Sequence, residues 1–501
     1  MGKIRGRHVF NILGLSIVAL WIVLLGVLIQ KTGFSRPPDA PRLEAGESLP
    51  EISSEREWME IYLKGKKVGY SMSQATALEK DYLIQEEIFL KLNLMGQTNN
   101  LRTVTRSVVD RGFRVKNFRF TVSSGVVDFL VSGSVGSEAL DIEIGRGERS
   151  RKVSIPVDEP PMLAAGIGYF LRGEKILLGR RFLFPIFDPS TMSNRKMEIR
   201  VAAKEQVVIN RIGYDAFRLE SNLYGQAVTF WVDKQGRVLK EEGFMGLTLV
   251  RSSGASAPFD IDKRGGDDFY ELAAVGLKGR LRSAEKTSFL RLEVEGADSA
   301  DFDPIMLNRG RQVYKGGILE IRKEEIPAAA SFRIPFEGHE DGMKRFLAPE
   351  MNMESDDPLV VKKALEIAGK SDDPITVSSR LMKWVHANME KRPLVSVPSA
   401  SDVIRTMTGD CNEHAVLLGA LLRAAGIPSR LCVGIVYARE KFFYHAWNEC
   451  YVGAWISMDA TMNQMPADAT HIKLIQGGLE EHAKLIGVIG KLSLKVVEYG
   501  Y

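Results

Sequence analysis

Thr408-Gly-Asp-Cys-Asn-Glu-His-Ala415 decides how the C-terminal part of this chain folds, because it places a thiol at the start of an apolar helix. Asp410 can cap that helix, with Glu413 as its capping-box partner. Apolar residues recur after the cysteine at intervals of three and four: Ala415, Leu418, Leu421, Leu422 and Ala425. One stripe of the helix therefore faces a core. Gly426 and Pro428 end the helix.

Cys411 would then lie at the positive end of this helix. Exposed backbone amides and the helix macrodipole stabilise a thiolate at such a position. The charge of Asp410 opposes this effect, so an additional cation is needed. A protonated His445 is the cation that we expect to supply it.

His445 and Asp459 follow on two predicted strands, after a first strand over Ser429–Ala438. Alternation along Tyr444-His-Ala-Trp-Asn-Glu-Cys-Tyr451 puts His445 and Trp447 on one face, and Trp455-Ile-Ser-Met-Asp459 alternates likewise. A turn of odd length centred on Val452 makes His445 and Asp459 cross-strand neighbours. A two-residue turn would move them out of register.

A cysteine nucleophile needs a base and a group that orients the base, and Cys411, His445 and Asp459 supply all three. Each residue also has a structural interpretation: a small buried hydrophobe, a core histidine, or a carboxylate that closes a turn. Their order along the chain favours the catalytic interpretation. His414 is a rival base, but it lies off the stripe of Cys411, and we expect it on the helix surface.

At these residues the sequence resembles the transglutaminase-like superfamily, in its bacterial branch. The motifs are Gly409-Asp-Cys411, Leu422-Arg-Ala-Ala-Gly-Ile-Pro-Ser-Arg430, His445-Ala-Trp447 and Trp455…Asp459-Ala-Thr461. The resemblance implies that Cys411 is the nucleophile, His445 the general base and Asp459 the residue that orients it. It also implies an α+β fold with a papain-like core, in which the cysteine helix packs on an antiparallel sheet. Ala460 departs from the family pattern, where proline is common.

The other chemistry-bearing residues suggest no further site. Cys432 and Cys450 lie on the two strands before and after the Arg439–Lys441 turn. A disulfide directly across two strands is strained, so we do not expect one here. No Cys/His cluster has metal spacing, and no phosphate-binding or dinucleotide-binding glycine motif occurs. We therefore expect neither a metal nor a cofactor.

Val9–Ile29 is apolar and long enough to cross a bilayer. Lys3, Arg5 and Arg7 precede it, which predicts a cytoplasmic tail over residues 1–8 and export of the rest of the chain. A cleaved signal peptide is the competing interpretation. An uncleaved anchor makes this a single-pass protein of the cell inner membrane, with its bulk in the periplasm.

The remaining chain predicts three regions after a linker over residues 30–55. A β-rich domain covers residues 56–257, with alternating strands at Met59–Leu63, Gln85–Leu94, Phe118–Val122 and Val228–Asp233 and a short helix at Pro160–Leu171. A smaller β-rich segment covers residues 258–350, and the transglutaminase-like domain covers residues 351–501. We expect the β-rich region to be a scaffold, and nothing in its residues names a ligand. The net charge of +4 over 501 residues gives no reason to expect nucleic-acid binding.

Attack of a thiolate on an amide carbonyl gives a thioester, which water or an amine resolves. The sequence therefore predicts an extracytoplasmic acyltransferase or cysteine peptidase/amidase that acts on peptide or protein amides of the cell envelope. One alternative is a non-catalytic binding or assembly protein of the envelope whose triad is vestigial. Another is an accessory protein that docks through its β-rich region.

Overall fold

The computed structural model describes residues 54–124, 128–145, 150–223, 226–296, 307–338, 342–394, 397, 399–477 and 490–501. These residues form two compact units, which meet in the sequence between Leu272 and Ala273. Val9–Ile29, the expected anchor, lies outside the described residues. Among the residues that are described, no helix is both long enough and apolar enough to cross a membrane.

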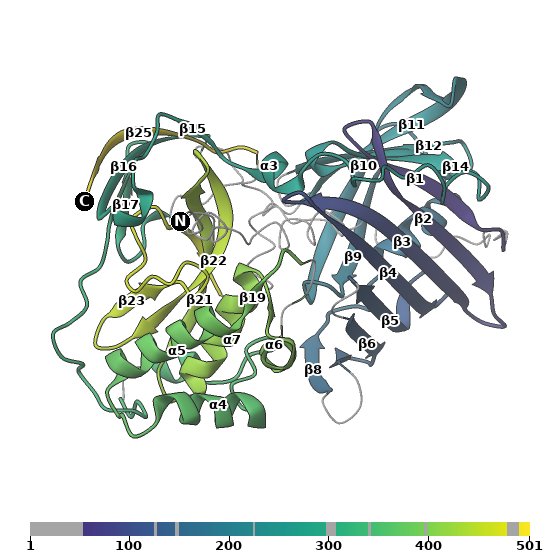
Figure 1. Cartoon of the computed structure of the whole chain (residues 1–501). Coiled ribbons are helices and arrows are strands. Elements are labelled where there is room, and N and C mark those ends of the chain that lie inside the picture. Colours follow the sequence, from purple (N-terminus) through teal and green to yellow (C-terminus); the bar gives the residue numbers. More distant parts are fainter. Residues whose placement is uncertain are drawn as a thin grey trace. The chain divides into compact units, whose positions relative to one another are not determined.

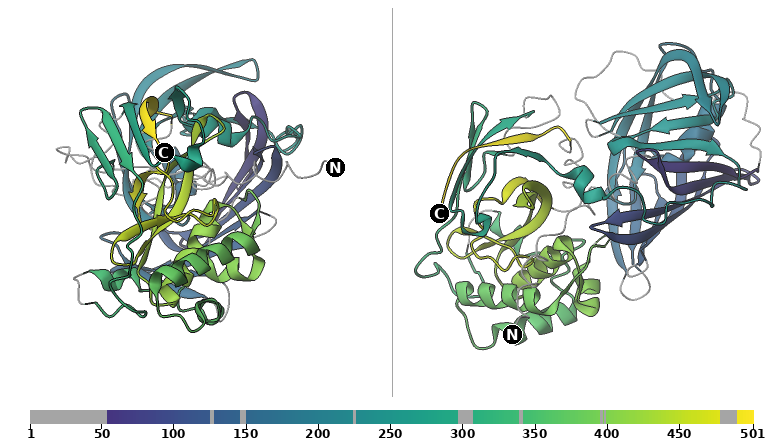
Figure 2. Two further views of the ribbon diagram at one scale, coloured as in Figure 1. Left: turned by 60° about the vertical axis from the view of Figure 1, so that its left-hand side comes forward. Right: turned by 45° about the horizontal axis from the view of Figure 1, so that its top comes forward.

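The first unit is a large antiparallel sheet, strongly curved, in the order β8-β7-β6-β5-β4-β3-β2-β1-β14-β13-β12-β11-β10-β9 (Figure 1, Figure 2). The chain runs strand by strand outward from β1 to β8, and β9 to β14 return to pair with β1 on its other edge. The strands are β1 (Glu57–Leu63), β2 (Lys66–Ala77), β3 (Tyr82–Leu94), β4 (Gln97–Val109), β5 (Val115–Ser123), β6 (Asp128–Val135), β7 (Ala139–Ile144), β8 (Arg151–Pro156), β9 (Arg181–Asp188), β10 (Ser193–Ile209), β11 (Ile212–Leu223), β12 (Gln226–Val232), β13 (Val238–Glu242) and β14 (Leu247–Ser252).

Period-two alternation explains why these segments are strands with one inner face. Successive side chains of a strand point to opposite faces. On one face of β3, Tyr82, Ile84, Ile88 and Leu90 are buried. The helix α2 (Ala164–Arg172) joins β8 to β9 and lies against the sheet, since its residues share an interior cavity with residues of several strands. The predicted strands and the predicted short helix are thus confirmed.

The second unit holds two sheets and a set of helices. A five-stranded sheet has the order β15-β25-β16-β18-β17, and a four-stranded sheet has the order β23-β22-β21-β24. The strands of the five-stranded sheet are β15 (Gly276–Lys278), β16 (Phe289–Glu295), β17 (Gln312–Lys315), β18 (Ile318–Arg322) and β25 (Ser493–Gly500). Those of the four-stranded sheet are β21 (Ser429–Ala438), β22 (Lys441–Tyr451), β23 (Trp455–Met458) and β24 (Ile472–Gln476). The C-terminal strand therefore completes the sheet begun by the segment that follows Ala273.

Helices cover the four-stranded sheet (Figure 1). The helices are α4 (Pro358–Ala368), α5 (Pro374–Asn388), α6 (Ala400–Thr406) and α7 (Cys411–Ala424). Two short strands, β19 (Glu390–Lys391) and β20 (Thr408–Gly409), pair with each other, and the helix α3 (Phe269–Ala273) spans the boundary between the two units. The short 3₁₀ turns are η2 (Phe244–Gly246), η3 (Ala284–Lys286) and η5 (Met343–Phe346). This arrangement agrees with the predicted α+β class.

The cysteine helix α7 packs on β22 through a close approach at Gly419. A Cβ atom on Gly419 would lie 2.6 Å from Sδ of Met353 and 3.0 Å from Nδ2 of Asn448. Without it, the Asn448 amide reaches the helix and donates to the carbonyl of Ala415 at 2.9 Å. The register of α7 on the sheet is thereby fixed.

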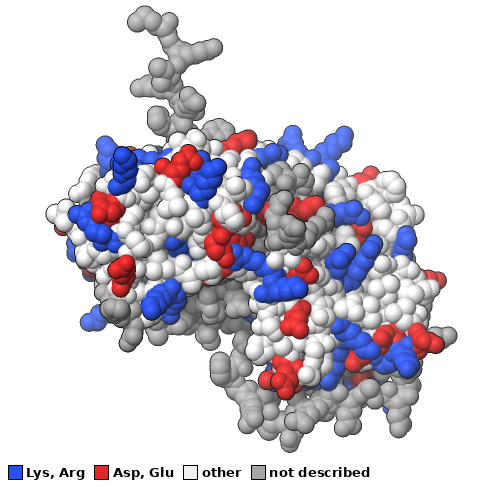
Figure 3. Space-filling view, turned by 90° about the horizontal axis from the view of Figure 1, so that it is seen from below, with Lys and Arg blue, Asp and Glu red and all other residues white. Residues whose placement is uncertain are grey.

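Charged side chains of both signs are intermixed on the face in Figure 3. This mixture accords with the small net charge of +4. A surface of this kind gives no electrostatic reason to expect a polyanionic partner.

A buried ion triad on the four-stranded sheet generates a stability prediction. Glu449 accepts from Nζ of Lys473 at 2.6 Å and from Nε of Arg430 at 2.6 Å. Burial alone would raise the pKa of Glu449, but the two cations hold it below its usual value. Replacing Glu449 with Gln leaves the ammonium of Lys473 buried without its counter-charge, and should lower the free energy of unfolding by about 3 kcal/mol.

Urea unfolding followed by tryptophan fluorescence measures this loss. Glu320→Gln is the matched control, because Glu320 pairs at 3.3 Å with Arg291 where both side chains are more than a third exposed. That control should change stability by less than about 1 kcal/mol. Equal effects of the two substitutions would show that the triad does not stabilise the fold.

Candidate active site

Cys411 is the first residue of α7, as the sequence predicts. Asp410 caps the helix and accepts from the amide of Asn412 at 2.9 Å. The carboxylate of Glu413 accepts in return from the amide of Asp410 at 2.8 Å. This capping box fixes the position of the thiol.

The thiol itself is buried, with 0% of Cys411 exposed. Its Sγ atom accepts from the backbone amide of Ala446, on β22, at 3.4 Å. Burial raises the pKa of Cys411 well above its usual value, and the negative charge of Asp410 adds to the shift. The expectation of a thiolate stabilised by the helix end is therefore wrong for this closed arrangement. The structure favours a neutral thiol.

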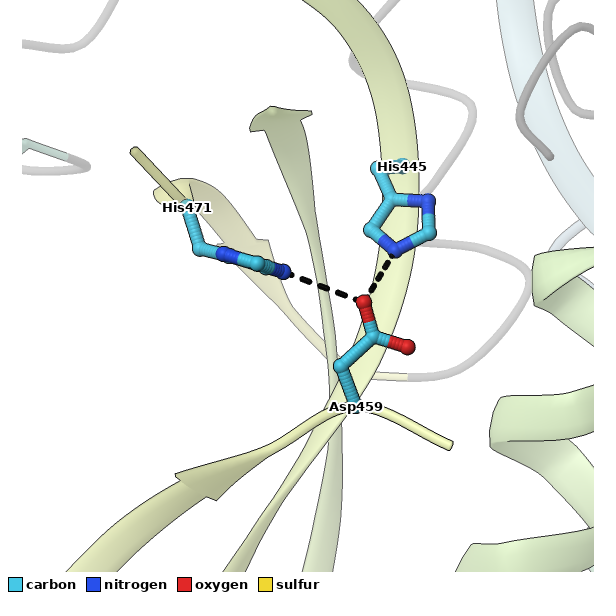
Figure 4. A group of neighbouring side chains, drawn as sticks. All are labelled: His445, Asp459 and His471. Carbon is cyan, nitrogen blue, oxygen red and sulfur yellow. Dashed lines mark hydrogen bonds and ion pairs between the residues drawn. The ribbon is translucent and has the colours of Figure 1, made fainter. Parts of the chain in front are cut away.

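His445 and Asp459 form an ion-pair contact, with Nε2 of His445 2.6 Å from Oδ2 of Asp459 (Figure 4). Both residues are at most 1% exposed. The other carboxylate oxygen of Asp459 accepts from the amides of Thr461 at 2.7 Å and Met462 at 3.1 Å. Since Nε2 is engaged, Nδ1 is the ring nitrogen that faces away from the carboxylate and is suited to exchange a proton with a thiol.

The pKa of Asp459 shows how a buried carboxylate stays ionised here. Burial alone would raise the pKa of Asp459, but it lies well below the usual value because His445 and His471 lower it through charge and hydrogen bonds. The carboxylate is therefore a permanent negative charge beside His445. Such a charge orients an imidazole and stabilises its protonated form.

The register between β22 and β23 differs from the prediction. Tyr451 pairs with Trp455, so the connecting loop has three residues and is centred on Gly453 rather than Val452. Gly453 has φ +109°, a conformation that favours glycine. The loop is odd, which keeps His445 and Asp459 on one face, but the two residues are diagonal neighbours rather than a direct pair. The side chains of His445 and Asp459 are long enough to make contact across this offset.

His471 is a third member of this group that the sequence did not reveal. Its Nε2 lies 3.0 Å from Oδ2 of Asp459 (Figure 4). Its Nδ1 lies 3.3 Å from Oδ1 of Asp468. Burial would lower the pKa of His471, but Asp468 and Asp459 raise it to about 9. His471 is therefore protonated at neutral pH and donates from both nitrogens. It positions the carboxylate that positions His445.

Trp447 packs against both histidines, whose rings also meet each other edge to face with centroids 5.7 Å apart. Its ring stacks on His445 with centroids 6.2 Å apart and meets the edge of His471 at 5.4 Å. The tryptophan is almost fully buried. It thus excludes water from the side of the imidazoles that faces the sheet.

His414, expected on the helix surface, is instead 0% exposed. Its Nδ1 lies 2.6 Å from the carbonyl oxygen of Asp410. Burial lowers the pKa of His414 to about 4, so it is neutral. The prediction failed because every side of α7 is covered by other elements, which a single apolar stripe does not reveal.

Cys432 and Cys450 are buried free thiols. Cys450 pairs in register with Ser429, and Cys432 with Trp447, so the two cysteines do not face each other. Burial raises the pKa of both. They match the expected absence of a disulfide in the described part of the second unit.

His445, Asp459 and His471 also offer three possible metal-ligand atoms within 4.8 Å of one another. Two histidines and a carboxylate are a ligand set that zinc accepts. Here, however, each Nε2 lies at hydrogen-bond distance from the same carboxylate oxygen. The three groups therefore fit a proton-linked network better than a metal centre.

Residues 362–460 match the model of the transglutaminase-like superfamily. The resemblance seen in the sequence is thus shown for that segment, which contains α7 and the predicted triad and ends before His471. Among curated proteins, none matches the chain.

Three solved structures resemble parts of the chain. A provisionally assigned cysteine protease from Cytophaga hutchinsonii is 19% identical over 45% of this chain and 85% of that one, with a TM-score of 0.27. The periplasmic domain of TgpA from Pseudomonas aeruginosa is 23% identical over 24% of this chain and 49% of that one, with a TM-score of 0.20. A beta-barrel-like protein of a domain of unknown function from Brucella abortus is 10% identical over 40% of this chain and 95% of that one, with a TM-score of 0.30.

The pKa of His471 generates a prediction for stability against pH. Its folded pKa of about 9 lies above the usual 6.5, so folding takes up a proton between these values. The stabilisation is complete below pH 6.5 and is lost as pH rises through about 9. Relative to His471→Gln, the wild-type chain should lose about 3 kcal/mol of unfolding free energy across this window.

Urea unfolding at a series of pH values gives the difference curve. His386→Gln is the control, since His386 is near the site but contacts only the carbonyl of Ala460 and the ammonium of Lys391. The control should keep the wild-type pH dependence. A His471→Gln curve parallel to that of wild type would contradict a protonated His471.

Proposed function

We propose that this chain is a transglutaminase-like cysteine enzyme that forms a thioester on Cys411 from the acyl group of a peptide or protein amide. The observation that carries the proposal is the 2.6 Å contact between His445 and an ionised Asp459. His445 lies on β22, the strand whose Ala446 amide contacts Sγ of Cys411, and Asp459 directly follows β23. The family match over residues 362–460 supports a cysteine enzyme at the coarse level.

In the proposed reaction, Nδ1 of His445 takes the proton of the Cys411 thiol as the sulfur attacks the amide carbonyl carbon. The C–N bond then breaks, and the imidazolium returns the proton to the leaving amine. Water or a second amine attacks the thioester, loses a proton to His445 and releases the thiol. The backbone amide of Cys411 is the proposed first donor to the oxyanion. The chemistry requires no metal or cofactor.

Burial of the thiol bears on how this reaction would begin. Burial raises the pKa of Cys411, so the closed site favours the neutral thiol. Proton transfer would then accompany the entry of substrate, when polar groups of the amide reach the sulfur. Water exclusion of this kind favours transfer to an amine over hydrolysis.

We further propose that the enzyme acts in the cell envelope. The support is the sequence alone: an apolar segment over Val9–Ile29 preceded by Lys3, Arg5 and Arg7. The bulk of the chain would then lie in the periplasm, anchored to the inner membrane. Its substrates would be peptide or protein amides of that compartment.

A second candidate is a non-catalytic binding or assembly protein of the envelope with a vestigial triad. The observation that favours it is the 0% exposure of Cys411, which leaves no open path to the sulfur. The intact network of His445, Asp459 and His471 counts against it. Burial opposes the charge of a carboxylate. In a site without catalytic function, we would expect a neutral residue in place of the buried, ionised Asp459.

The acyl-transfer proposal predicts a covalent adduct on one cysteine. The full chain is mixed with peptides from a cell-envelope extract, quenched in acid and digested, and acyl adducts are located by mass spectrometry. We expect the adduct on Cys411 alone. His445→Ala should slow its formation by about 10²-fold or more, the usual contribution of a general base.

Cys450→Ala is the matched control, because it removes a buried thiol from β22 without touching the site. It should form the adduct at the wild-type rate. Adducts spread equally over the three cysteines, or none on Cys411, would favour the vestigial triad.

The envelope proposal predicts the topology of the chain. A phosphatase that folds only outside the cytoplasm, fused after Tyr501, should be active in cells. Replacing Lys3, Arg5 and Arg7 with Glu should reduce that activity, because positive charges hold the amino terminus inside. Activity of a cytoplasmic reporter at the same fusion point would overturn the topology.

A further inference from the structure

The first unit encloses a cavity of about 110 Å³ between α2 and the sheet. Its wall is largely apolar, and the side chains that supply it include Met59, Ile88, Ile167 and Phe230. These come from β1, β3, α2 and β12, so the cavity lies inside one unit. A cavity that holds a benzene-sized molecule measures ~150 Å³. This cavity is smaller, so it has room for a hydrocarbon chain of about three carbons.

Two carboxyl groups line the same cavity, Glu86 on β3 and Glu241 on β13. Glu86 occupies a position in phase with the buried residues Ile84 and Ile88, but it is itself only partly buried. Glu241 is 5% exposed, and its Oε1 atom is buried without a hydrogen-bond partner. An unpaired carboxylate oxygen in an apolar wall is costly unless something supplies a donor.

The arginines of the cavity wall do not supply that donor. Arg251 donates to Oε1 of Glu57 at 3.0 Å, and Arg172 donates to Oε2 of the same residue. Glu57 therefore engages one nitrogen of each guanidinium group, while Nε of Arg172 is buried without a hydrogen-bond partner. The hydroxyl of Tyr169 donates to Oγ of Ser73 at 3.1 Å, so it too is engaged.

The pKa values of Glu86 and Glu241 are both raised, which indicates that neither carboxylate has a compensating cation among the described residues. Burial raises the pKa of Glu86 to about 7. Burial, with the charge of Glu86 as a second cause, raises the pKa of Glu241 well above its usual value. Both groups are thus destabilised as anions by dehydration, and Glu241 is destabilised further by the charge of Glu86. A cation placed between them would relieve both effects.

We propose that this cavity binds a small amphiphilic primary amine, with its ammonium group between Glu86 and Glu241 and its hydrocarbon part against the apolar wall. An ammonium carries three donors on a compact charge, which suits two converging carboxylates. Calcium would need six to eight oxygen ligands, and the apolar wall does not provide them. The proposal concerns the first unit and does not depend on the chemistry of Cys411.

Propylamine is the probe, titrated into the full chain by calorimetry. Propan-1-ol has the same chain without the charge, and propanoate reverses the charge. We expect propylamine to bind the wild-type chain at least about 10-fold more tightly than either, as a charged hydrogen-bonded pair contributes this much or more. Glu241→Gln and Glu86→Gln should each weaken propylamine binding by about 10-fold or more.

Glu79→Gln is the matched control, because it removes an exposed carboxylate from the β2–β3 turn and should leave binding unchanged. Cys411→Ala should bind propylamine as wild type does, which separates this site from an acyl-acceptor site. Thermal unfolding of each variant tests whether it is folded, and Glu86→Gln is the deciding variant if Glu241→Gln does not fold. No binding of propylamine, equally tight binding of propan-1-ol, or unchanged propylamine binding by a folded cavity variant would overturn the proposal.

Discussion

The candidate site depends on keeping one carboxylate ionised where water does not reach it. Asp459 is 0% exposed, and burial opposes its charge. Two backbone amides bind one of its oxygens, and the two histidines bind the other. All four donors must be in place together, because removing any one leaves part of the charge uncompensated. A single side chain therefore constrains three parts of the fold. These are the turn after β23, the position of His445 on β22 and the residue that precedes β24.

This requirement explains why His471 is held by a second carboxylate. A protonated histidine beside Asp459 would by itself offset the negative charge that His445 needs. Asp468 restores the balance, since its pKa also lies below the usual value despite burial, lowered by His471. His471 and Asp468 together are close to neutral. They orient Asp459 without cancelling its effect on the imidazole of His445.

The sequence predicted those parts of the site that depend on interactions between residues close together in the chain. The helix from Cys411 and the strand Ser429–Ala438 agree with the structure because capping and periodicity are short-range signals. The loop centred on Gly453 was misplaced by one residue because alternation fixes parity but not register. His471 was missed since no local pattern links it to Asp459, and the two meet only through the sheet. Burial of Cys411 likewise depends on elements that periodicity does not place.

In the first unit, alternation predicted the strands but not what the curved sheet encloses. Glu86 and Glu241 are separated by most of the unit in sequence, and each looks like an ordinary polar strand residue. The sheet brings β3 and β13 to one cavity, with three strands between them in its order. Two carboxyl groups that gain nothing from each other persist in an apolar wall, where isosteric neutral residues would be less costly. The pair is therefore a cost to the fold of the first unit, and the proposed amine would offset that cost.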